Sequence, residues 1–241
     1  KTISVVMASY NGMPFIKEQI QTILKNLNIN DELIVSDDHS NDGTLEYLKE
    51  LEKVEKRVRI LDGPQKDIKE NFKNAIISAN GEYIFVADQD DIWLDNKVET
   101  VLRAFRENKK AVVIVHDNIV IDSNKNVIYD SYFKFRNCGK GIVKNIYKNT
   151  YIGCCMAFKN EIKEKILRMP NNILMHDQWI GIIGELYGQT IFLDDKLMLY
   201  RRHGNNNSSF KHYPLKIMLK NRIIFSYELI KYYFKYYLKE K

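Results

Sequence analysis

Three carboxylates lie within the four positions Asp88-Gln89-Asp90-Asp91, which directly follow the apolar run EYIFVA. Like charges at this spacing repel one another unless a cation or a ligand lies among them. Asp88 and Asp90 are two residues apart at a predicted strand end, so they project to the same side and can share one ligand. Because carboxylates are the usual ligands of hard divalent cations, the segment predicts a site for Mg²⁺ or Mn²⁺. In the alternative interpretation this is an Asp-rich turn, with Asp91 capping the next helix.

Two further polar segments follow apolar runs in the first half of the chain. Tyr10-Asn11-Gly12 follows the run TISVVMAS, and DDHSNDGT follows the run ELIVS. Helical patterns of about 10 to 15 residues separate these runs, which predicts a mainly parallel sheet with helices on both faces. Since ligands bind beyond the carboxyl ends of parallel strands, we expect all three polar segments to meet at one edge of the sheet.

The pattern changes at Ala111, and the second half predicts an α+β arrangement that forms the other wall of a cleft. We therefore divide the chain into residues 1–110 as the ligand-binding half, 111–210 as the second half of the same domain, and 211–241 as a tail. In the second half we expect strands at 111–122, 127–131 and 152–158, a short helix at 160–168, a helix after His176-Asp177, a strand pair at 190–203 and irregular structure at 130–148.

Composition excludes several classes of protein. The chain has 241 residues, 45% of them hydrophobic, which is sufficient for one domain with a substantial core. It has no uncharged apolar run long enough to span a membrane, and we expect no signal peptide because a strand begins at once. The three cysteines have no CxxC spacing, so neither a disulfide framework nor a zinc site is predicted, and a reducing cytoplasm fits. The dinucleotide and P-loop glycine motifs are both missing.

The positive charge belongs to the tail. Residues 211–241 contain eight Lys or Arg and two Glu, a surplus of six that equals the net charge of the whole chain. The neutral body argues against nucleic-acid binding. In a helical tail, Glu228, Lys231, Lys235 and Lys239 fall on one stripe among tyrosines, which suits an anionic membrane surface. The alternative is a helix packed on the domain or in a homo-oligomer.

Over roughly residues 1–205, which include the three polar segments, the chain resembles the family 2 glycosyltransferases. VVMASYNG, ELIVSDDHSNDGT and GEYIFVADQDD resemble the family's opening strand, its second-strand loop and its DxD segment. DQDDIW, HDQW and YRRHGNN resemble a bacterial subgroup of rhamnosyltransferases. Ser36, His39 and the HDQW segment depart from the common pattern. The resemblance implies an α/β fold of the GT-A type, with a Rossmann-like sheet and a C-terminal amphipathic helix.

The resemblance also implies inverting transfer of a sugar from a UDP- or dTDP-sugar to an acceptor hydroxyl. According to the resemblance, Asp90 is the direct metal ligand, and Asp88 contacts the ribose or a metal-bound water. Asp37 or Asp38 accepts the N3–H of uracil or thymine; both remain candidates. The remaining donor contacts that it implies are Ser9, Tyr10, Asn11 and Gln89.

Three candidates lie in the second half of the chain. Asp177 matches the family's general base, which takes the acceptor proton; alternatively it is an ordinary helix cap. Trp179 is predicted either as a platform for the acceptor or as a core residue. His203 either completes the metal shell or donates to phosphate beside Arg201 or Arg202; alternatively it is a plain surface histidine.

The expected acceptor is a lipid-linked saccharide used in bacterial surface polysaccharide synthesis, at the inner face of the plasma membrane. A metal-dependent nucleotidyl or phosphoryl transferase also uses paired carboxylates and is one alternative. The other is a non-catalytic module that binds a membrane surface.

Overall fold

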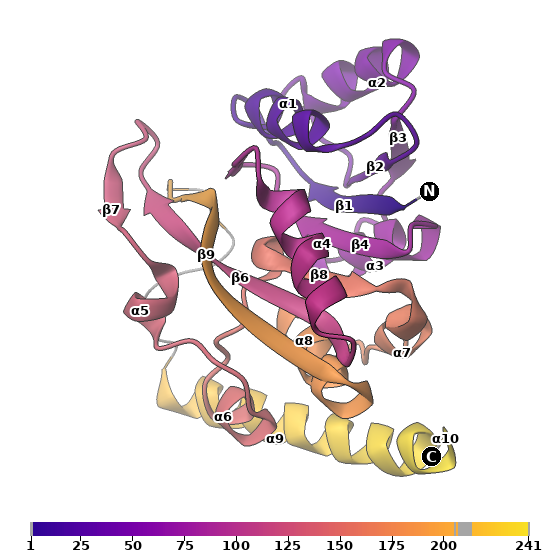
Figure 1. Cartoon of the computed structure of the whole chain (residues 1–241), viewed down its shortest axis with the longest axis vertical. Helices are drawn as coiled ribbons and strands as arrows, with labels where there is room; N and C mark the ends of the chain where they lie inside the picture. Colours follow the sequence, from indigo (N-terminus) through magenta and orange to yellow (C-terminus); the bar gives the residue numbers. More distant parts are fainter. Residues whose placement is uncertain (1, 205, 207–213, 241) are drawn as a thin grey trace.

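One mixed sheet carries both halves of the chain (Figure 1). The structure, a computed structural model, describes residues 2–204, 206 and 214–240. Within them the strand order is β3-β2-β1-β4-β8-β6-β9-β5, and β7 pairs with β6. The strands are β1 (Ile3–Ser9), β2 (Glu32–Asp37), β3 (Val58–Asp62), β4 (Tyr83–Ala87), β5 (Ile92–Trp93), β6 (Ala111–Ile121), β7 (Val127–Tyr129), β8 (Met156–Lys159) and β9 (Gln189–Arg201).

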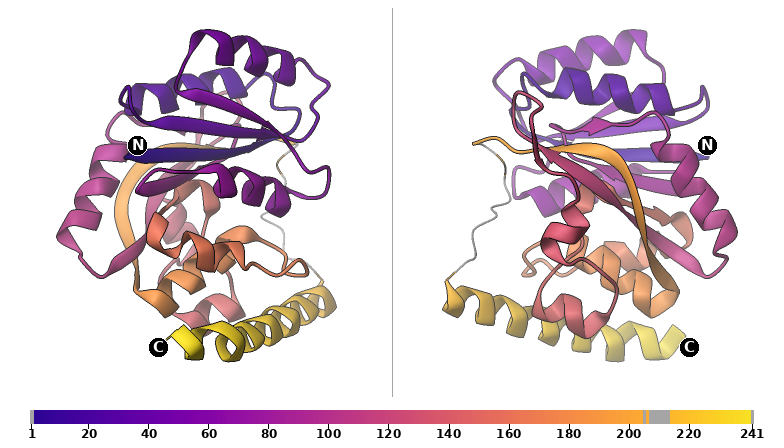
Figure 2. Two further views of the ribbon diagram at one scale, coloured as in Figure 1. Left: turned by 90° about the vertical axis from the view of Figure 1, so that its right-hand side faces the viewer. Right: turned by 60° about the vertical axis from the view of Figure 1, so that its left-hand side comes forward.

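The first four strands form the parallel part of the sheet, as predicted. β1 pairs in parallel with β2 and β4, and β2 pairs in parallel with β3. Every residue of β1 is buried, which is expected of a central strand covered on both faces. Helices α1 (Ile16–Asn26) and α2 (Thr44–Val54) lie on one face, and α3 (Ile68–Ser78) lies on the other (Figure 2).

The second half is mixed. β8 is antiparallel to both β4 and β6, whereas β9 runs parallel to β6. The prediction of a strand pair at 190–203 is wrong, because β9 is one strand of 13 residues. His116 pairs with Leu193 and Asp117 with Lys196, so Asp194 and Asp195 form a bulge where the sequence indicated a turn.

Five α-helices lie between β5 and β9, and three of them have only five or six residues. They are α4 (Lys97–Glu107), α5 (Tyr132–Arg136), α6 (Ile142–Tyr147), α7 (Lys163–Leu167) and α8 (His176–Tyr187), with 3₁₀ turns at Gly153–Cys155 and Asn160–Ile162. Helices α5 and α6 occupy the segment predicted to be irregular, and a 3₁₀ turn replaces the start of the strand predicted at 152–158.

The tail is one continuous helical segment across the end of the molecule farthest from α1 and α2 (Figure 1). It comprises α9 (Leu215–Tyr232), a π-helical turn (Tyr233–Tyr237) and α10 (Leu238–Glu240). Phe225, Leu229 and Tyr232 are buried against the domain. The start of the predicted tail, residues 211–213, lies outside the described residues. Among those described, no helix is sufficiently long and apolar to cross a bilayer.

Candidate active site

The sheet register brings the ends of β1, β2 and β4 together. Met7 is paired with Ala87 and Ser9 with Asp37, so the three loops that follow these strands start side by side. They border a cavity of about 510 Å³, and the predicted meeting of the polar segments is confirmed. Its lining includes Ser9, Tyr10, Asp38, Asp67, Ile68, Asn71, Asp88, Gln89, Asp90, Tyr132, Tyr151, Leu174, His176, Asp177, Tyr200 and Asn206.

The two carboxylates after β2 have different surroundings. Asp37 is buried, and its Oδ2 accepts hydrogen bonds from the hydroxyls of Ser9 and Ser40, each at 2.7 Å. The backbone N–H of Ser40 donates to its Oδ1 at 2.9 Å. Asp38 instead lines the cavity, and Gln65 N–H donates to its Oδ1 at 2.6 Å. Of the two candidates, only Asp38 therefore lines the cavity.

A clasp made by Gln89 joins the loop after β4 to the loop after β1. The N–H of Tyr10 donates to Gln89 Oε1 at 2.9 Å, and Gln89 Nε2 donates to the Tyr10 carbonyl at 3.0 Å. A Cβ on Gly12 would lie 2.7 Å from Gln89 Oε1, so this close approach requires glycine. Asn11 turns away from the cavity: it adopts a positive φ of 47°, and its Oδ1 accepts from Asn41 N–H at 2.9 Å. The structure therefore assigns it to the turn.

Asp90 and His203 are brought together from distant parts of the chain, as the metal-site prediction requires. His203 Nε2 lies 2.7 Å from Asp90 Oδ2, and Asn206 Nδ2 donates to the same oxygen at 3.0 Å. Asn206 was not predicted individually, although it closes the YRRHGNN motif. An imidazole and a carboxylate at this separation are both suitable ligands for a divalent cation.

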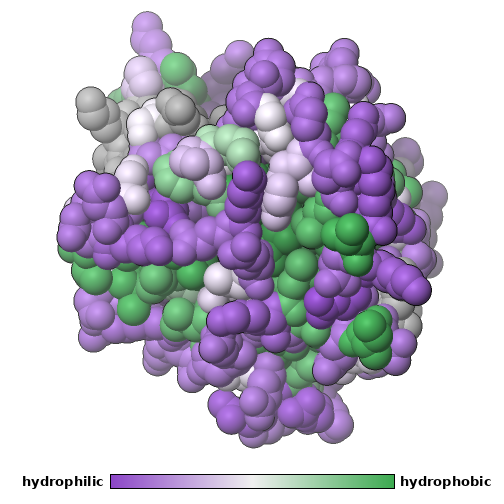
Figure 3. Space-filling model, turned by 90° about the horizontal axis from the view of Figure 1, so that it is seen from above, coloured by the Kyte–Doolittle hydropathy of each residue, from purple (hydrophilic) through white to green (hydrophobic). Residues whose placement is uncertain are grey.

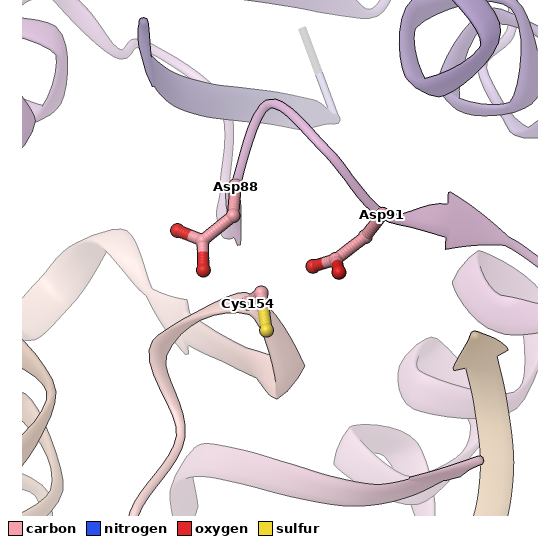
Figure 4. A group of neighbouring side chains, drawn as sticks. All are labelled: Asp88, Asp91 and Cys154. Atoms are coloured by element: carbon pink, nitrogen blue, oxygen red, sulfur yellow. The ribbon is translucent and has the colours of Figure 1, made fainter. Parts of the chain in front are cut away.

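Asp88, Asp91 and Cys154 form a second group at the same loop, with potential ligand atoms that all lie within 4.8 Å of one another (Figure 4). Asp91 does not cap a helix: its Oδ1 accepts from Arg201 N–H at 2.9 Å, and its buried Oδ2 has no hydrogen-bond partner among the described residues. Burial, followed by the charge of Asp90, raises the pKa of Asp88 to about 7, and burial raises that of Asp91 as well.

The charge balance of this group fits a cation. Lys97 lies beneath it, fully buried, with its Nζ donating to the Cys154 carbonyl at 2.9 Å and stacked 3.9 Å from the centre of the Trp93 ring. Burial lowers the pKa of Lys97 to about 8, so it supplies a single positive charge at neutral pH beside the carboxyl groups of Asp88 and Asp91. An orphaned carboxylate oxygen and raised carboxyl pKa values are what a preformed cation site shows in the absence of its ion.

Arg201 does not face the cavity, and its predicted donor contact is corrected. Its side chain is 2% exposed, with Nη2 2.8 Å from Glu18 Oε2. Nε donates to the Asp90 carbonyl at 2.8 Å and Nη1 to the Ser123 carbonyl at 3.3 Å. All three nitrogens are engaged inside the protein, so the Arg201 side chain holds the loop after β4 in place and does not reach into the cavity.

Asp177 faces the carboxylate loops from the opposite wall. It lies in the first turn of α8 and lines the cavity; its Oδ1 accepts from Asn149 Nδ2 at 3.0 Å and Gln178 N–H at 2.6 Å. Burial raises its pKa to about 6. The N-cap of α8 is Met175, and no side chain caps this helix, so the alternative role of Asp177 as a cap is wrong. A carboxylate with such a pKa is suited to accept a proton near neutral pH.

Trp179 cannot serve as an acceptor platform. It is fully buried, its Nε1 donates to the Ile166 carbonyl at 3.1 Å, and its ring packs edge-on against Tyr232 and Phe225 of the tail. Besides the predicted Tyr10, the tyrosines that line the cavity are Tyr132, Tyr151 and Tyr200, which no periodic pattern in the sequence identifies.

Comparisons with known proteins identify the family to which this chain belongs. The family model "Glycosyl transferase family 2" matches residues 4–167, and the chain belongs to this family. The dTDP-rhamnosyl transferase RfbG of Shigella flexneri is 28% identical over 229 residues, covering 85% of this chain and 75% of the relative. The putative teichuronic acid biosynthesis glycosyltransferase TuaG of Bacillus subtilis is 26% identical over 214 residues, covering 87% and 82%.

Solved structures confirm the GT-A fold. S. aureus TarS in complex with UDP-GlcNAc has a TM-score of 0.69 at 17% identity, covering 92% of this chain and 64% of that one. The mannosyltransferase PcManGT of Pyrobaculum calidifontis, in complex with GDP-Man and Mn²⁺, has a TM-score of 0.61 at 16% identity, covering 82% and 56%. The chain thus spans less than two thirds of the length of either structure.

Proposed function

We propose that this protein is an inverting glycosyltransferase that moves a sugar from a UDP- or dTDP-sugar to an acceptor hydroxyl. The observation that carries this proposal is the presence of two kinds of carboxylate in one cavity. Asp177 has one oxygen engaged and a pKa of about 6, whereas the Asp88–Asp91 group has a buried carboxylate oxygen without a hydrogen-bond partner among the described residues. The first suits proton acceptance, and the second suits binding of a cation with a diphosphate.

The donor is held at the ends of β1 and β2. Asp38 presents a carboxylate to the cavity, where it accepts the N3–H of uracil or thymine, and Tyr10, which is 57% exposed, covers the base. Cytosine has no N3–H, so this contact favours uridine and thymidine nucleotides. Asp37 supports the site indirectly, because it fixes Ser9 and Ser40 around the turn.

Asp90, Asp88 and His203 are the residues that would hold Mn²⁺ or Mg²⁺. When bound, the ion neutralises the negative charge that develops on the diphosphate leaving group. Gln89 and Arg201 keep the loop in place through the Tyr10 clasp and the Asp90 carbonyl. The loop is therefore fixed from both sides before any ligand is bound.

The transfer step needs one base. The acceptor oxygen attacks the anomeric carbon, the bond from that carbon to the diphosphate oxygen breaks, and the acceptor proton passes to Asp177. A single displacement of this kind inverts the anomeric configuration. Asn149 and Gln178 orient the Asp177 carboxylate through Oδ1, while no hydrogen bond to Oδ2 is found within the described part of the chain.

The acceptor is a saccharide, carried on a lipid in bacterial surface polysaccharide synthesis. Tyr132, Tyr151 and Tyr200 give the cavity wall beside Asp177 the aromatic character that sugar rings stack against. One relative, 31% identical over 153 residues and covering 63% of this chain, is the E. coli enzyme described as UDP-Glc:alpha-D-GlcNAc-diphosphoundecaprenol beta-1,3-glucosyltransferase WfgD. That name describes a lipid-linked acceptor for the relative and supports the same class here.

The test is to incubate the full chain and Mn²⁺ with UDP-glucose, UDP-N-acetylglucosamine or dTDP-rhamnose, with and without a diphosphate-lipid-linked saccharide. We expect release of UDP or dTDP to be stimulated by the acceptor, and a product with inverted configuration. Release of pyrophosphate or phosphate instead would indicate nucleotidyl or phosphoryl transfer. A thermal-shift panel of the same donors identifies the bound nucleotide independently of turnover, since ligand binding raises the melting temperature.

A further inference from the structure

The outward side of the tail helix carries an unusual row of exposed apolar side chains. Ile223 is 69% exposed, Tyr227 62%, Ile230 57% and Phe234 64%. The row recurs every three or four residues, so it follows one side of a helix. We call it the outer stripe; its members are Leu219, Ile223, Tyr227, Ile230, Phe234 and Leu238.

Lysines run along one edge of the outer stripe. Lys220, Lys231, Lys235 and Lys239 each follow a stripe residue directly in sequence, which places them about 100° further round the helix. All four are exposed. The predicted stripe of Glu228 with lysines is corrected, because Glu228 is buried and accepts from Asn172 Nδ2 at 2.8 Å.

The acidic residues of the tail point inward. Besides Glu228, the tail has only Glu240, which is paired with Arg168 and accepts from the Tyr187 hydroxyl at 2.9 Å. The outward side therefore combines apolar and positive groups without an acid of its own. Trp179 and Tyr232 hold the inner side on the domain with ring centroids 5.1 Å apart, so the direction of the outer stripe is fixed.

We propose that the outer stripe and its lysine row dock the enzyme on a bilayer surface rich in anionic phospholipid. The apolar side chains enter the headgroup region, and the lysines meet phosphate groups beside them. A second copy of the chain is a poorer occupant, because pairing two outer stripes brings lysine rows together, while Glu228 and Glu240 of each tail are already engaged by Asn172 and Arg168 of the same chain. The proposal does not depend on which sugar is transferred.

The orientation that follows agrees with the rest of the surface. The tail lies at one end of the molecule, and α1 and α2 lie at the other (Figure 1). The face at that other end is mostly hydrophilic, with apolar residues in smaller groups among polar ones (Figure 3). With the tail on a bilayer, the nucleotide-binding strands point toward water, where a soluble donor is found.

The experiment is sedimentation of the full chain with vesicles of phosphatidylcholine containing 30% phosphatidylglycerol, and with pure phosphatidylcholine. We expect binding to the anionic vesicles that weakens in 0.5 M NaCl, since salt screens the lysines. The double variant Ile230→Ser/Phe234→Ser should lose at least tenfold in partition. Lys231→Gln/Lys235→Gln/Lys239→Gln should lose on the order of 100-fold, about fivefold for each lysine.

Matched controls keep the number of changes equal. Lys25→Gln/Lys49→Gln/Lys109→Gln removes three exposed lysines elsewhere, and Ile29→Ser/Val54→Ser removes two exposed apolar side chains. Both should bind vesicles as the unmodified protein does. Failure to bind anionic vesicles, or equal loss in tail and control variants, overturns the proposal. A dimer that dissociates in the Ile230→Ser/Phe234→Ser variant, without vesicle binding, identifies a second copy as the occupant.

Discussion

The ends of β2 and β4 both present carboxylates to the same edge of the sheet, yet they are built in opposite ways. Asp37 receives three hydrogen bonds from Ser9 and Ser40. Asp91 retains a buried oxygen without a partner, and burial raises the pKa of Asp88 to about 7. A carboxylate that the protein satisfies itself stabilises the fold, whereas carboxylates left short of partners are available to a ligand.

The largest expected effect is at the end of β4. Asp90→Ala should reduce sugar transfer on the order of 10³-fold, because the charge stabilisation supplied by a bound cation amounts to several kcal/mol. Calorimetry with UDP or dTDP and Mn²⁺ should show loss of metal-dependent affinity with an unchanged melting temperature. Asp95→Ala, an exposed aspartate of the same segment, is the control. Unchanged metal-dependent affinity in Asp90→Ala would remove this loop from the metal site.

The second largest effect on transfer is expected at Asp177, on the opposite wall of the cavity. Asp177→Asn keeps the shape of the side chain but cannot accept a proton, and loss of a general base costs about 10² to 10⁴ in rate. We expect transfer to fall on the order of 10²-fold, at the lower end of this range, while donor affinity, measured by the same calorimetry, stays near that of the unmodified protein. If transfer continues at a normal rate, another residue is the base.

At the end of β2, we expect substitution of Asp37 to lower the stability of the fold. Asp37→Ala leaves Ser9 and Ser40 without their acceptor, and we expect the free energy of unfolding to drop by about 1 to 3 kcal/mol. Denaturant titration measures this drop. The matched change Asp38→Ala, at the cavity, should leave unfolding almost unchanged and weaken uridine or thymidine nucleotide binding. The reverse outcome would exchange the roles of the two residues.

The smallest expected effect is that of pH. With a pKa of about 6, Asp177 is mostly ionised at pH 7 and mostly protonated at pH 5. Transfer should therefore fall about tenfold from pH 7 to pH 5. The contribution of Asp177 to the free energy of unfolding depends on pH in the opposite direction. Because burial raises its pKa from 3.8 in the unfolded chain to about 6 in the folded one, this contribution is fully present below pH 3.8 and is lost as the pH rises through about 6. A pH–rate profile without an acid limb near 6 would contradict the assignment.

The sequence predicted the parallel half well and the other half less well, for physical reasons. Apolar runs bounded by turn residues defined β1 to β4, and parallel topology then placed their loops together. Helices α5 and α6 have only five and six residues, too few to show a helical period. The bulge at Asp194 and Asp195 has the composition of a turn, so only the pairing with β6 distinguishes the two.

The misassigned side chains share one cause: their partners are distant in sequence. Arg201 is neutralised by Glu18, 183 residues away, so its local motif gave no sign that its charge was already used. Trp179 is buried by Phe225 and Tyr232 of the tail, whose packing no local pattern specifies. Asp90 and His203 were paired correctly only because the family resemblance linked their motifs.

The Gln89 clasp has a consequence for the entropy of donor binding. The side-chain amide of Gln89 accepts a hydrogen bond from the N–H of Tyr10 and donates one to its carbonyl oxygen. It therefore pairs with the Tyr10 backbone as a peptide group of a neighbouring strand would. The loop after β1 and the loop after β4 are thereby joined as one unit in the folded protein. A donor that contacts both loops does not have to immobilise each of them separately, and more of its contact energy remains as affinity.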